Sequence, residues 1–175
     1  MRKGQNNYAY IDGANLHNAV KNFSWDFDYG RFRVWLEDKY FVKQAYIFLG
    51  FIPRHTALYV QLWKQGYSLV FKEVVYSQER KPKGNCDADL IVRAMIDTYE
   101  KNYDKAVLVS SDGDFSPLVK FLDKRNIIQT ILSPYSIAKC SILLKRTGVK
   151  ISCISNQKRI LIDKKEKAPD ADFPA

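Results

Sequence analysis

The stretch Ala106–Phe115 reads AVLVSSDGDF and joins an apolar run to a pair of acids. Its first half, Ala106–Ser110, consists of small and apolar residues and predicts a buried strand. The run is followed by two carboxylates, Asp112 and Asp114, which a single glycine separates. Pro117 and the spaced apolar residues after it predict a helix. The two acids therefore lie where a strand ends and a helix begins. An open α/β sheet forms its binding sites at such places, although either acid is also a common helix cap.

Strands and helices alternate on both sides of this stretch. We expect further strands at residues 8–11, 42–49, 67–75, 127–132 and 149–154, and further helices at 13–20, 29–39, 54–65, 87–103 and 137–145. The alternation predicts an α/β fold, a three-layer α/β/α domain with a mainly parallel central sheet. We assign this domain to residues 1–160 and expect residues 161–175, which are charged and contain prolines, to form a disordered tail.

Single residues predict several boundaries of these elements. Asp28 is placed to cap the helix at 29–39, and Gly66 and Asn126 are placed to end helices in the left-handed conformation. Lys72 and Glu73 in the third strand indicate a position near an edge of the sheet.

The composition fits one globular domain with a nucleic-acid partner. The chain has 175 residues, 46% of them hydrophobic and 14% aromatic, and a formal net charge of +9. A basic body around an acidic pocket predicts a polyanionic partner, because the body attracts phosphates that the pocket cannot hold without a cation. The other interpretation is a basic surface that only keeps the protein in solution.

The cysteines and the apolar runs indicate a cytoplasmic protein. Cys86, Cys140 and Cys153 are odd in number and lack the spacing of metal ligands, so we expect reduced thiols. No apolar run approaches the length that crosses a membrane, and the N-terminal MRKGQNN lacks the apolar core of a signal peptide. We therefore expect no contact with a membrane.

Three further aspartates belong to the helix expected at 87–103. Asp87 and Asp89 are two residues apart, about 200° around a helix, so only one of them can face a common crevice, and we favour Asp87. The other interpretation of both is a helix cap. Asp97 lies about 15 Å farther along the axis, and we expect it to be solvated.

An acidic crevice follows if the first and fourth strands are neighbours. Asp12 ends the first strand, so it would converge with Asp112 and Asp114, and Asp87 would complete the group. Several carboxylates in one cleft repel one another and require a cation. Oxygen ligands select Mg²⁺ or Mn²⁺ over zinc, and such ions bind phosphates and activate water.

A basic loop precedes Asp87. Its cations, Arg80, Lys81 and Lys83, are suited to hold a nucleic-acid backbone. An ordinary solvated loop is the alternative, and the sequence does not decide between the two.

Three motifs in this order resemble the signatures of the NYN domain, a branch of the PIN-like nucleases. They are IDGANL at Ile11–Leu16, KGNCDADL at Lys83–Leu90 and LVSSDGDFSPLV at Leu108–Val119. The resemblance extends from about Tyr8 to about Ile154. It implies a PIN-like fold and a metal-dependent ribonuclease that hydrolyses RNA phosphodiester bonds.

The resemblance also implies site residues. The catalytic acids and metal ligands would be Asp12, Asp87, Asp112 and Asp114, with Asn15 as a polar neighbour that orients ligand or water. Ser110 is similar to the serine that usually precedes the acids, and we expect it at the nucleic acid. Asp89 would lie next to the metal ligands without binding the metal itself. Ser111 stands where glycine is often found in the family.

Two other functions remain open at this point. One is an RNA-binding or regulatory module of the same fold without cleavage. The other, a phosphatase with an Asp-x-Asp nucleophile, fits less well because that motif usually ends the first strand, whereas here it follows the fourth. The RNA, the choice between endonuclease and exonuclease, and a homodimeric state are likewise open.

Overall fold

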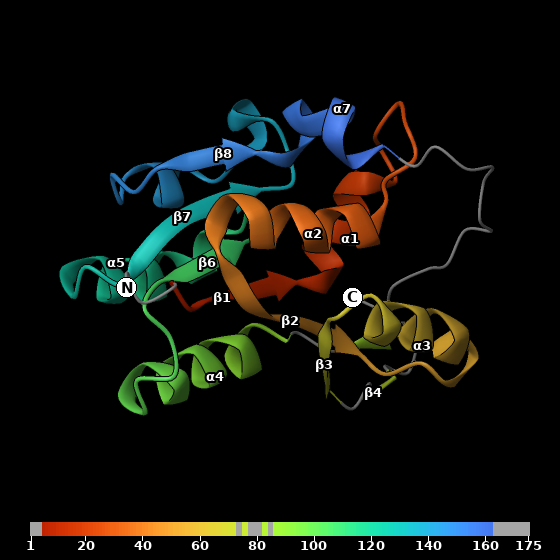
Figure 1. Cartoon of the computed structure of the whole chain (residues 1–175), viewed down its shortest axis with the longest axis horizontal. Helices are drawn as coiled ribbons and strands as arrows, with labels where there is room; N and C mark the ends of the chain where they lie inside the picture. Colours follow the sequence, from red (N-terminus) through yellow and green to blue (C-terminus); the bar gives the residue numbers. More distant parts are fainter. Residues whose placement is uncertain (1–4, 73–74, 77–81, 84–85, 163–175) are drawn as a thin grey trace.

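Six parallel strands form the central sheet of the computed structural model, which describes residues 5–72, 75–76, 82–83 and 86–162. The strands of the described residues are β1 (Asn7–Asp12), β2 (Val42–Gly50), β3 (Ser68–Lys72), β4 (Val75–Tyr76), β5 (Pro82–Lys83), β6 (Ala106–Val109), β7 (Ile128–Ser133) and β8 (Ile151–Cys153). The sheet has the order β3-β2-β1-β6-β7-β8, and β4 and β5 form a separate antiparallel pair (Figure 1). The predicted α/β fold with a mainly parallel sheet is confirmed.

Helices cover both faces of this sheet. They are α1 (Gly13–Val20), α2 (Tyr29–Tyr40), α3 (Thr56–Lys64), α4 (Asp87–Tyr99), α5 (Ser116–Lys124), α6 (Ile142–Lys145) and α7 (Lys158–Leu161), with short 3-10 turns η1 (Pro53–His55), η2 (Gly113–Phe115), η3 (Ile137–Lys139) and η4 (Ile154–Gln157). One hydrophobic core contains residues of α1, α2, α3 and α7, and the other contains residues of α4, α5 and α6. The arrangement is the three-layer architecture that the sequence predicts.

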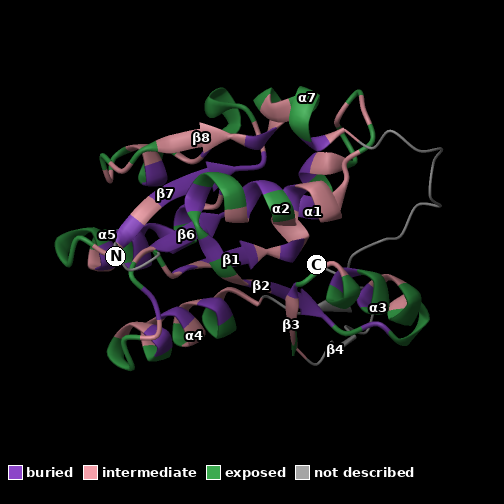
Figure 2. Ribbon diagram, viewed as in Figure 1, coloured by how far each residue is buried: buried purple, intermediate pink, exposed green. Residues whose placement is uncertain are grey.

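Alternation along β1 shows how one strand serves both cores. Ala9 and Ile11 belong to the core under α1 and α2, whereas Tyr10 belongs to the core under α4. All three side chains are buried, because a strand inside a parallel sheet has a helix layer on each side. Burial of a large apolar side chain contributes roughly 1.5–3 kcal/mol, so a strand with side chains in both cores contributes to stability on each face. Figure 2 shows the buried central strands and the exposed outer turns of the helices.

The stretch AVLVSSDGDF occupies the centre of the sheet. All four residues of β6 are buried, and the strand pairs with β1 on one side and β7 on the other. Ile11 is in register with Val109, so β1 and β6 end at the same level. The chain order reverses between these two strands, since β2 and β3 lie beyond β1 while β7 and β8 lie beyond β6. The predicted neighbourhood of the first and fourth strands is confirmed.

The predicted boundary residues have their expected conformations. The Asp28 carboxylate accepts a hydrogen bond of 3.0 Å from the Arg31 amide and caps α2. Gly66 and Asn126 have φ angles of +90° and +55° and follow the last turns of α3 and α5. The strand with Lys72, β3, is one of the two edge strands of the six-stranded sheet, as expected.

Two helices differ from expectation in length. The helix expected at 87–103 ends at Tyr99, because Lys101 has a left-handed φ of 56° and turns the chain toward β6. The helix expected at 137–145 is divided into η3 and α6, since Cys140 between them is extended and buried.

The prediction that Asp97 is solvated is wrong. Its side chain is 0% exposed, and it accepts hydrogen bonds from the Tyr10 hydroxyl at 3.0 Å, Arg93 Nε at 3.0 Å and Asn102 Nδ2 at 2.9 Å. The sequence contains the signal for this burial. Leu90, Ala94 and Asp97 follow one another at intervals of four and three residues, which places all three on the same face of α4. A charge on this stripe is stable only because three donors surround it.

No helix within the described residues is long and apolar enough to cross a membrane. Most of the tail expected to be disordered, residues 163–175, lies outside the described residues, and the division at residue 160 stays a prediction.

Replacement of Asp97 tests this buried network. We expect Asp97→Ala to lower the free energy of unfolding by about 3 kcal/mol, because the Tyr10 hydroxyl and the Arg93 guanidinium lose a buried acceptor. Urea denaturation at pH 7 measures the change. Asp123→Ala, at an exposed position of α5, is the matched control and should change the value by no more than about 0.5 kcal/mol. Equal effects of the two substitutions would contradict the assigned role of Asp97.

Candidate functional site

The ends of β1 and β6 are joined by side-chain hydrogen bonds. Ser110 Oγ donates to Asp12 Oδ2 at 3.0 Å, and the same hydroxyl oxygen accepts from the Asp112 amide at 3.1 Å. The side chain of Ser110 is fully buried. Its hydroxyl therefore links the Asp12 carboxylate to the backbone that carries Asp112, and its expected contact with nucleic acid stays a prediction.

Asn15 connects the turn after β1 to the turn after β6. Its side-chain Oδ1 accepts a hydrogen bond from the Ser111 backbone amide at 3.0 Å, and its backbone amide donates to Asp12 Oδ1 at 3.0 Å. Both oxygen atoms of Asp12 thus accept a hydrogen bond from a neighbour in the fold. Ser111 takes part in this link through its backbone amide, which a glycine at this position would also provide.

Three carboxylates from two separate segments converge above these turns. Asp87, Asp112 and Asp114 each offer an oxygen atom, and these three atoms all lie within 4.8 Å of one another. Asp87 is in the first turn of α4, whereas Asp112 precedes η2 and Asp114 lies within it. Oxygen atoms this close could hold a metal ion, which would remove their mutual repulsion.

Capping and clustering are not alternatives at Asp112. Its Oδ1 accepts a hydrogen bond of 3.0 Å from the Asp114 amide and caps η2. The same side chain belongs to the group of three acids. Oδ1 of Asp112 accepts the capping hydrogen bond, so the cap also fixes the orientation of the Asp112 carboxylate within the group of three acids.

Glycines allow both turns to approach their neighbours closely. A Cβ atom at Gly13 would lie 2.5 Å from the Phe48 carbonyl oxygen, and one at Gly113 would collide with Ser141 Oγ. Any larger residue between Asp112 and Asp114 would therefore displace this turn from Ser141, which caps α6. The glycine in each acidic motif has a packing reason that is independent of charge.

Asp12 is not part of the group of three, and its electrostatics differ from theirs. Burial raises the pKa of the Asp12 carboxyl to about 6, and the charges of Asp87 and Asp112 add to the effect. The hydrogen bonds from Asn15 and Ser110 oppose this rise in pKa but do not cancel it. Burial therefore makes the Asp12 carboxyl harder to ionise, and the neighbouring charges of Asp87 and Asp112 strengthen this effect.

The other predicted residues have different positions. Asp89 forms an ion pair of 3.6 Å with Lys72 at the end of β3. The prediction for Arg80 and Lys81 lies outside the described residues, and of Lys83 the structure describes only its place in β5. Their contact with nucleic acid stays a prediction.

Tyr135 is a neighbour of the site that the sequence analysis missed. It follows β7, and burial together with the charge of Asp12 raises the pKa of its phenol. Ser133, at the end of β7, contacts the hydroxyl of Ser111 at 3.0 Å and donates to the Tyr135 carbonyl oxygen at 2.8 Å. The sequence could have indicated Tyr135, because it follows β7, and β7 is the neighbour of β6 in the sheet.

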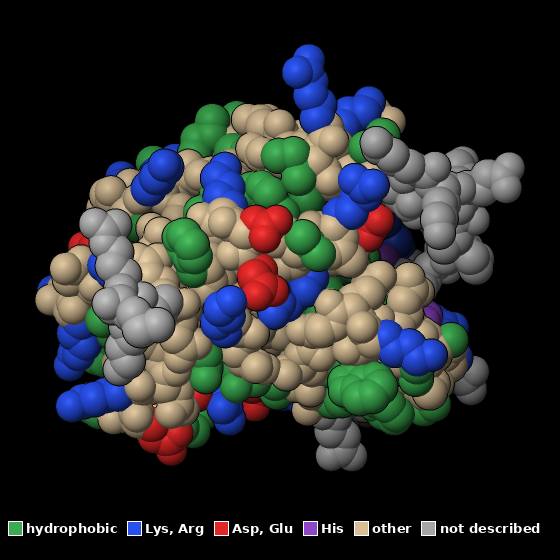
Figure 3. Space-filling model, in the orientation of Figure 1, with side chains coloured by type: hydrophobic (Ala, Val, Ile, Leu, Met, Phe, Trp, Pro, Cys, Tyr) green, Lys and Arg blue, Asp and Glu red, His purple; other side chains and the backbone are tan. Residues whose placement is uncertain are grey.

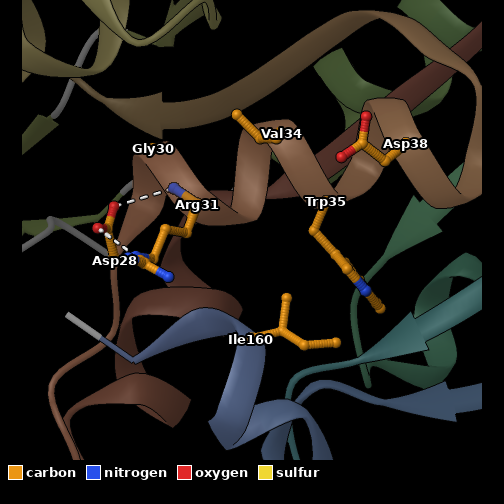
Figure 4. Close-up of a pocket in the computed structure, with 7 residues that line it drawn as sticks. All are labelled: Asp28, Gly30, Arg31, Val34, Trp35, Asp38 and Ile160. Atoms are coloured by element: carbon orange, nitrogen blue, oxygen red, sulfur yellow. Dashed lines mark hydrogen bonds and ion pairs between the residues drawn. The ribbon is translucent and has the colours of Figure 1, made fainter. Parts of the chain in front are cut away.

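A hollow of about 440 Å³ between α2 and α7 lies apart from these acids (Figure 4). Trp35 and Ile160 face each other across it, and Arg31 pairs with the capping residue Asp28 at its rim. Its polar groups serve α2 itself, so we assign it no function.

Comparisons with known proteins agree with this geometry. The sequence model of one family, described as the NYN domain, matches residues 8–145, well over half of the chain. Among curated proteins, none is similar enough in sequence to count as a match. In its fold the chain is similar to a crystal structure of a protein of unknown function from Vibrio parahaemolyticus, with a TM-score of 0.70 and 21% identity. That likeness covers 88% of this chain and 95% of the other, and at this identity it shows the fold alone.

The raised pKa of Asp12 predicts a pH-dependent stability of the metal-free protein. The carboxyl has a pKa of about 6 in the fold and about 3.9 when unfolded, so the folded state binds the proton more tightly. The free energy of unfolding should therefore fall as pH rises from about 4 to about 6, by up to about 3 kcal/mol. Asp12→Asn should remove this part of the decline, because the amide does not ionise.

Urea denaturation across this pH range compares the wild type, Asp12→Asn and the exposed-site control Asp123→Asn. The control should decline as the wild type does. A decline of the same size in Asp12→Asn would show that Asp12 has an ordinary pKa.

Proposed function

Because the chain belongs to the NYN domain family, we propose that it is a metal-dependent ribonuclease that hydrolyses RNA phosphodiester bonds, in the manner of an endonuclease. The single observation that supports this proposal most strongly is the convergence of Asp87, Asp112 and Asp114 at the carboxyl edge of the sheet. In an open parallel sheet this edge, at the reversal of strand order, is where ligands bind.

The donor set fits Mg²⁺ or Mn²⁺. It consists of carboxylate oxygens, and the described residues place no histidine in the group. Hard cations of this kind prefer oxygen ligands and retain several water molecules. Asp87 lies at the N-terminus of α4, where the helix dipole favours negative charge and offsets part of the repulsion among the acids.

The residues around this set have separate roles in the proposal. A bound ion would neutralise charge on the phosphate and lower the pKa of its bound water. Asp114 in η2, Asp112 just before η2 and Asp87 in α4 would hold the ion. Asp12 supplies a further carboxylate beside them, and Asn15 and Ser110 fix the orientation of that carboxylate.

Support for RNA as the partner comes from the family and from the charge of +9. The alternative, an RNA-binding module without cleavage, shares the fold and the partner. The two differ in whether RNA is cut when a metal ion is supplied.

A cleavage assay with the variant Asp112→Asn tests the proposal. We expect the wild type to cut mixed RNAs with Mn²⁺ or Mg²⁺ and to stop when EDTA is added. Asp112→Asn keeps an acceptor for the Asp114 amide but removes a metal ligand. Its rate should therefore fall by more than about 100-fold, beyond the loss typical of a residue that only supports a ligand. RNA binding without any product in the wild type would favour the module instead.

Thermal melting of the same variant separates the cap from the metal site. In EDTA, Asp112→Asn should melt at a higher temperature than the wild type, because like-charge repulsion is reduced while the cap remains. Mn²⁺ should stabilise the wild type and should stabilise the variant much less. Asp123→Asn is the control and should leave both melting temperatures close to those of the wild type. A lower melting temperature in EDTA together with normal cleavage would reduce Asp112 to a helix cap.

The basic loop gives an independent prediction. If Arg80, Lys81 and Lys83 contact phosphates, their combined replacement by alanine should weaken RNA binding and reduce its dependence on salt. The slope of log K against log salt should fall by about 0.7 for each lost phosphate contact with a single strand. Fluorescence anisotropy at several salt concentrations measures the slope. An unchanged slope would assign these side chains to solvent.

A further inference from the structure

An aromatic groove lies between α3 and β3, at the edge of the sheet. Its volume is about 390 Å³, and it is lined chiefly by Phe51, Tyr59, Val60, Trp63, Leu69 and Phe71. We use the name aromatic groove for this set. The volume is in the range of pockets that bind small ligands.

The rings of the aromatic groove are held in place before any ligand arrives. The Tyr59 hydroxyl accepts from the Ile52 amide at 3.0 Å and donates to the Gly50 carbonyl at 3.3 Å. The Tyr59 ring lies edge to face with Phe71 at a centroid distance of 4.8 Å, and Phe51 contacts Phe71 at 5.4 Å. These contacts hold the Tyr59 and Phe71 rings in place, so these side chains lose little conformational freedom when a ligand binds.

The outer rings are unusually exposed for aromatic side chains. Trp63 is 68% exposed, and Phe51 and Phe71 are 44% and 42% exposed. Scattered exposed apolar residues are common, but a contiguous group around a hollow marks a binding surface. Figure 3 shows hydrophobic side chains gathered around α3, with basic side chains beside them.

The charge around the groove favours an anionic ligand. The sequence contains no acidic residue from Lys39 to Lys72. Arg54 before α3 and Lys64 at its end are both exposed, and Lys72 ends β3. A ligand with flat rings and negative charge matches these two properties together.

The position of the groove connects it to the acids. Phe71 is in register with Leu49 of β2, and Asp12 of β1 is in register with Phe48. The backbone of Phe71 therefore lies two strand spacings from β1, about 10 Å away. Phe71 and Asp12 both lie at the carboxyl ends of their strands. The next residue, Lys72, pairs with Asp89, which is two residues from Asp87.

We propose that the aromatic groove binds unpaired nucleobases of the RNA strand, which stack on Trp63 and its neighbours while the backbone continues to the acids. This inference rests on the proposed ribonuclease function. Stacking on aromatic rings accepts any base and requires that the base be unpaired. The groove therefore selects single-stranded segments next to the cleaved bond.

A second copy of the chain fits the groove less well. Two molecules that meet there would bring Arg54, Lys64 and their counterparts together, in a protein whose net charge is already +9. A protein partner remains as an outcome of the test.

The experiment measures binding of short fluorescent oligonucleotides by anisotropy in EDTA, where cleavage does not interfere. The probes are an oligoadenylate, an abasic oligomer of the same length and an RNA duplex. Trp63→Ala should weaken binding of the oligoadenylate roughly 5- to 150-fold, which corresponds to the loss of a base–aromatic stack. Binding of the abasic oligomer and the duplex should change less than twofold, because neither offers an unpaired base.

Two further variants serve as controls. Tyr99→Ala removes a ring that is also 68% exposed but lies at the far end of α4, and it should leave oligoadenylate binding unchanged. Trp63→Phe keeps a ring and should restore most of the affinity. Because Trp63 is exposed, Trp63→Ala should melt within a few degrees of the wild type.

Each result has one meaning. Equal binding of oligoadenylate by Trp63→Ala and Tyr99→Ala, in a protein that cuts RNA, would overturn the stacking site and leave the proposed function intact. Loss of abasic binding to the same extent would also overturn it. A shift from dimer to monomer in gel filtration of Trp63→Ala, without a change in RNA binding, would assign the groove to a protein interface. A wild type that neither binds nor cuts RNA would overturn both proposals.

Discussion

The parallel pairing of β1 with β6 is the constraint on which the site depends. Both strands are internal, and Ile11, the residue before the last of β1, is in register with Val109, the last residue of β6. Two turns that are distant in the sequence must therefore leave the sheet side by side. The hydroxyl of Ser110 occupies the space between them and contacts Asp12 and the Asp112 amide. A slip of one residue in this pairing would move the side chains of the slipped strand to the opposite face of the sheet, so hydrophobic burial protects the geometry of the acids.

Asp87 reaches the same place by a different route. It belongs to α4, whose orientation on the sheet is set by the buried carboxylate of Asp97 and its hydrogen bond to Tyr10 of β1. Arg93 adds a contact to β2, because it donates to the Tyr46 hydroxyl at 2.8 Å and lies over that ring. A satisfied buried charge has few alternative positions, so it specifies how the helix lies more narrowly than apolar packing does. Asp97, near the C-terminal end of α4, thus helps to position Asp87 at the N-terminal end, where Asp87 lies close to Asp112 and Asp114.

The carboxyl edge of the sheet has two chemical halves. The acids lie over β1 and β6 at the reversal of strand order, whereas aromatic rings and cations lie over β2 and β3. A polyanion with flat rings would find a counter-charge and a stacking surface on one half. It would find repulsion on the other, unless a cation is present. If RNA binds as we propose, this asymmetry would give the strand one preferred direction of approach and would make productive binding dependent on a metal ion.

Local pattern in the sequence determined the elements, and tertiary packing decided how they meet. The apolar run before Asp112, the cap at Asp28 and the choice of Asp87 over Asp89 all depend on residues within one or two turns of each other, so the sequence predicts them well. The burial of Asp97 was also encoded, in the spacing of Leu90, Ala94 and Asp97, but its partner Tyr10 comes from a strand 87 residues away. Which strands are neighbours, how deeply Asp12 is buried and how the rings of α3 meet β3 are set by packing between distant segments. No local pattern contains that information, because desolvation and contact depend on what the rest of the chain places around a residue.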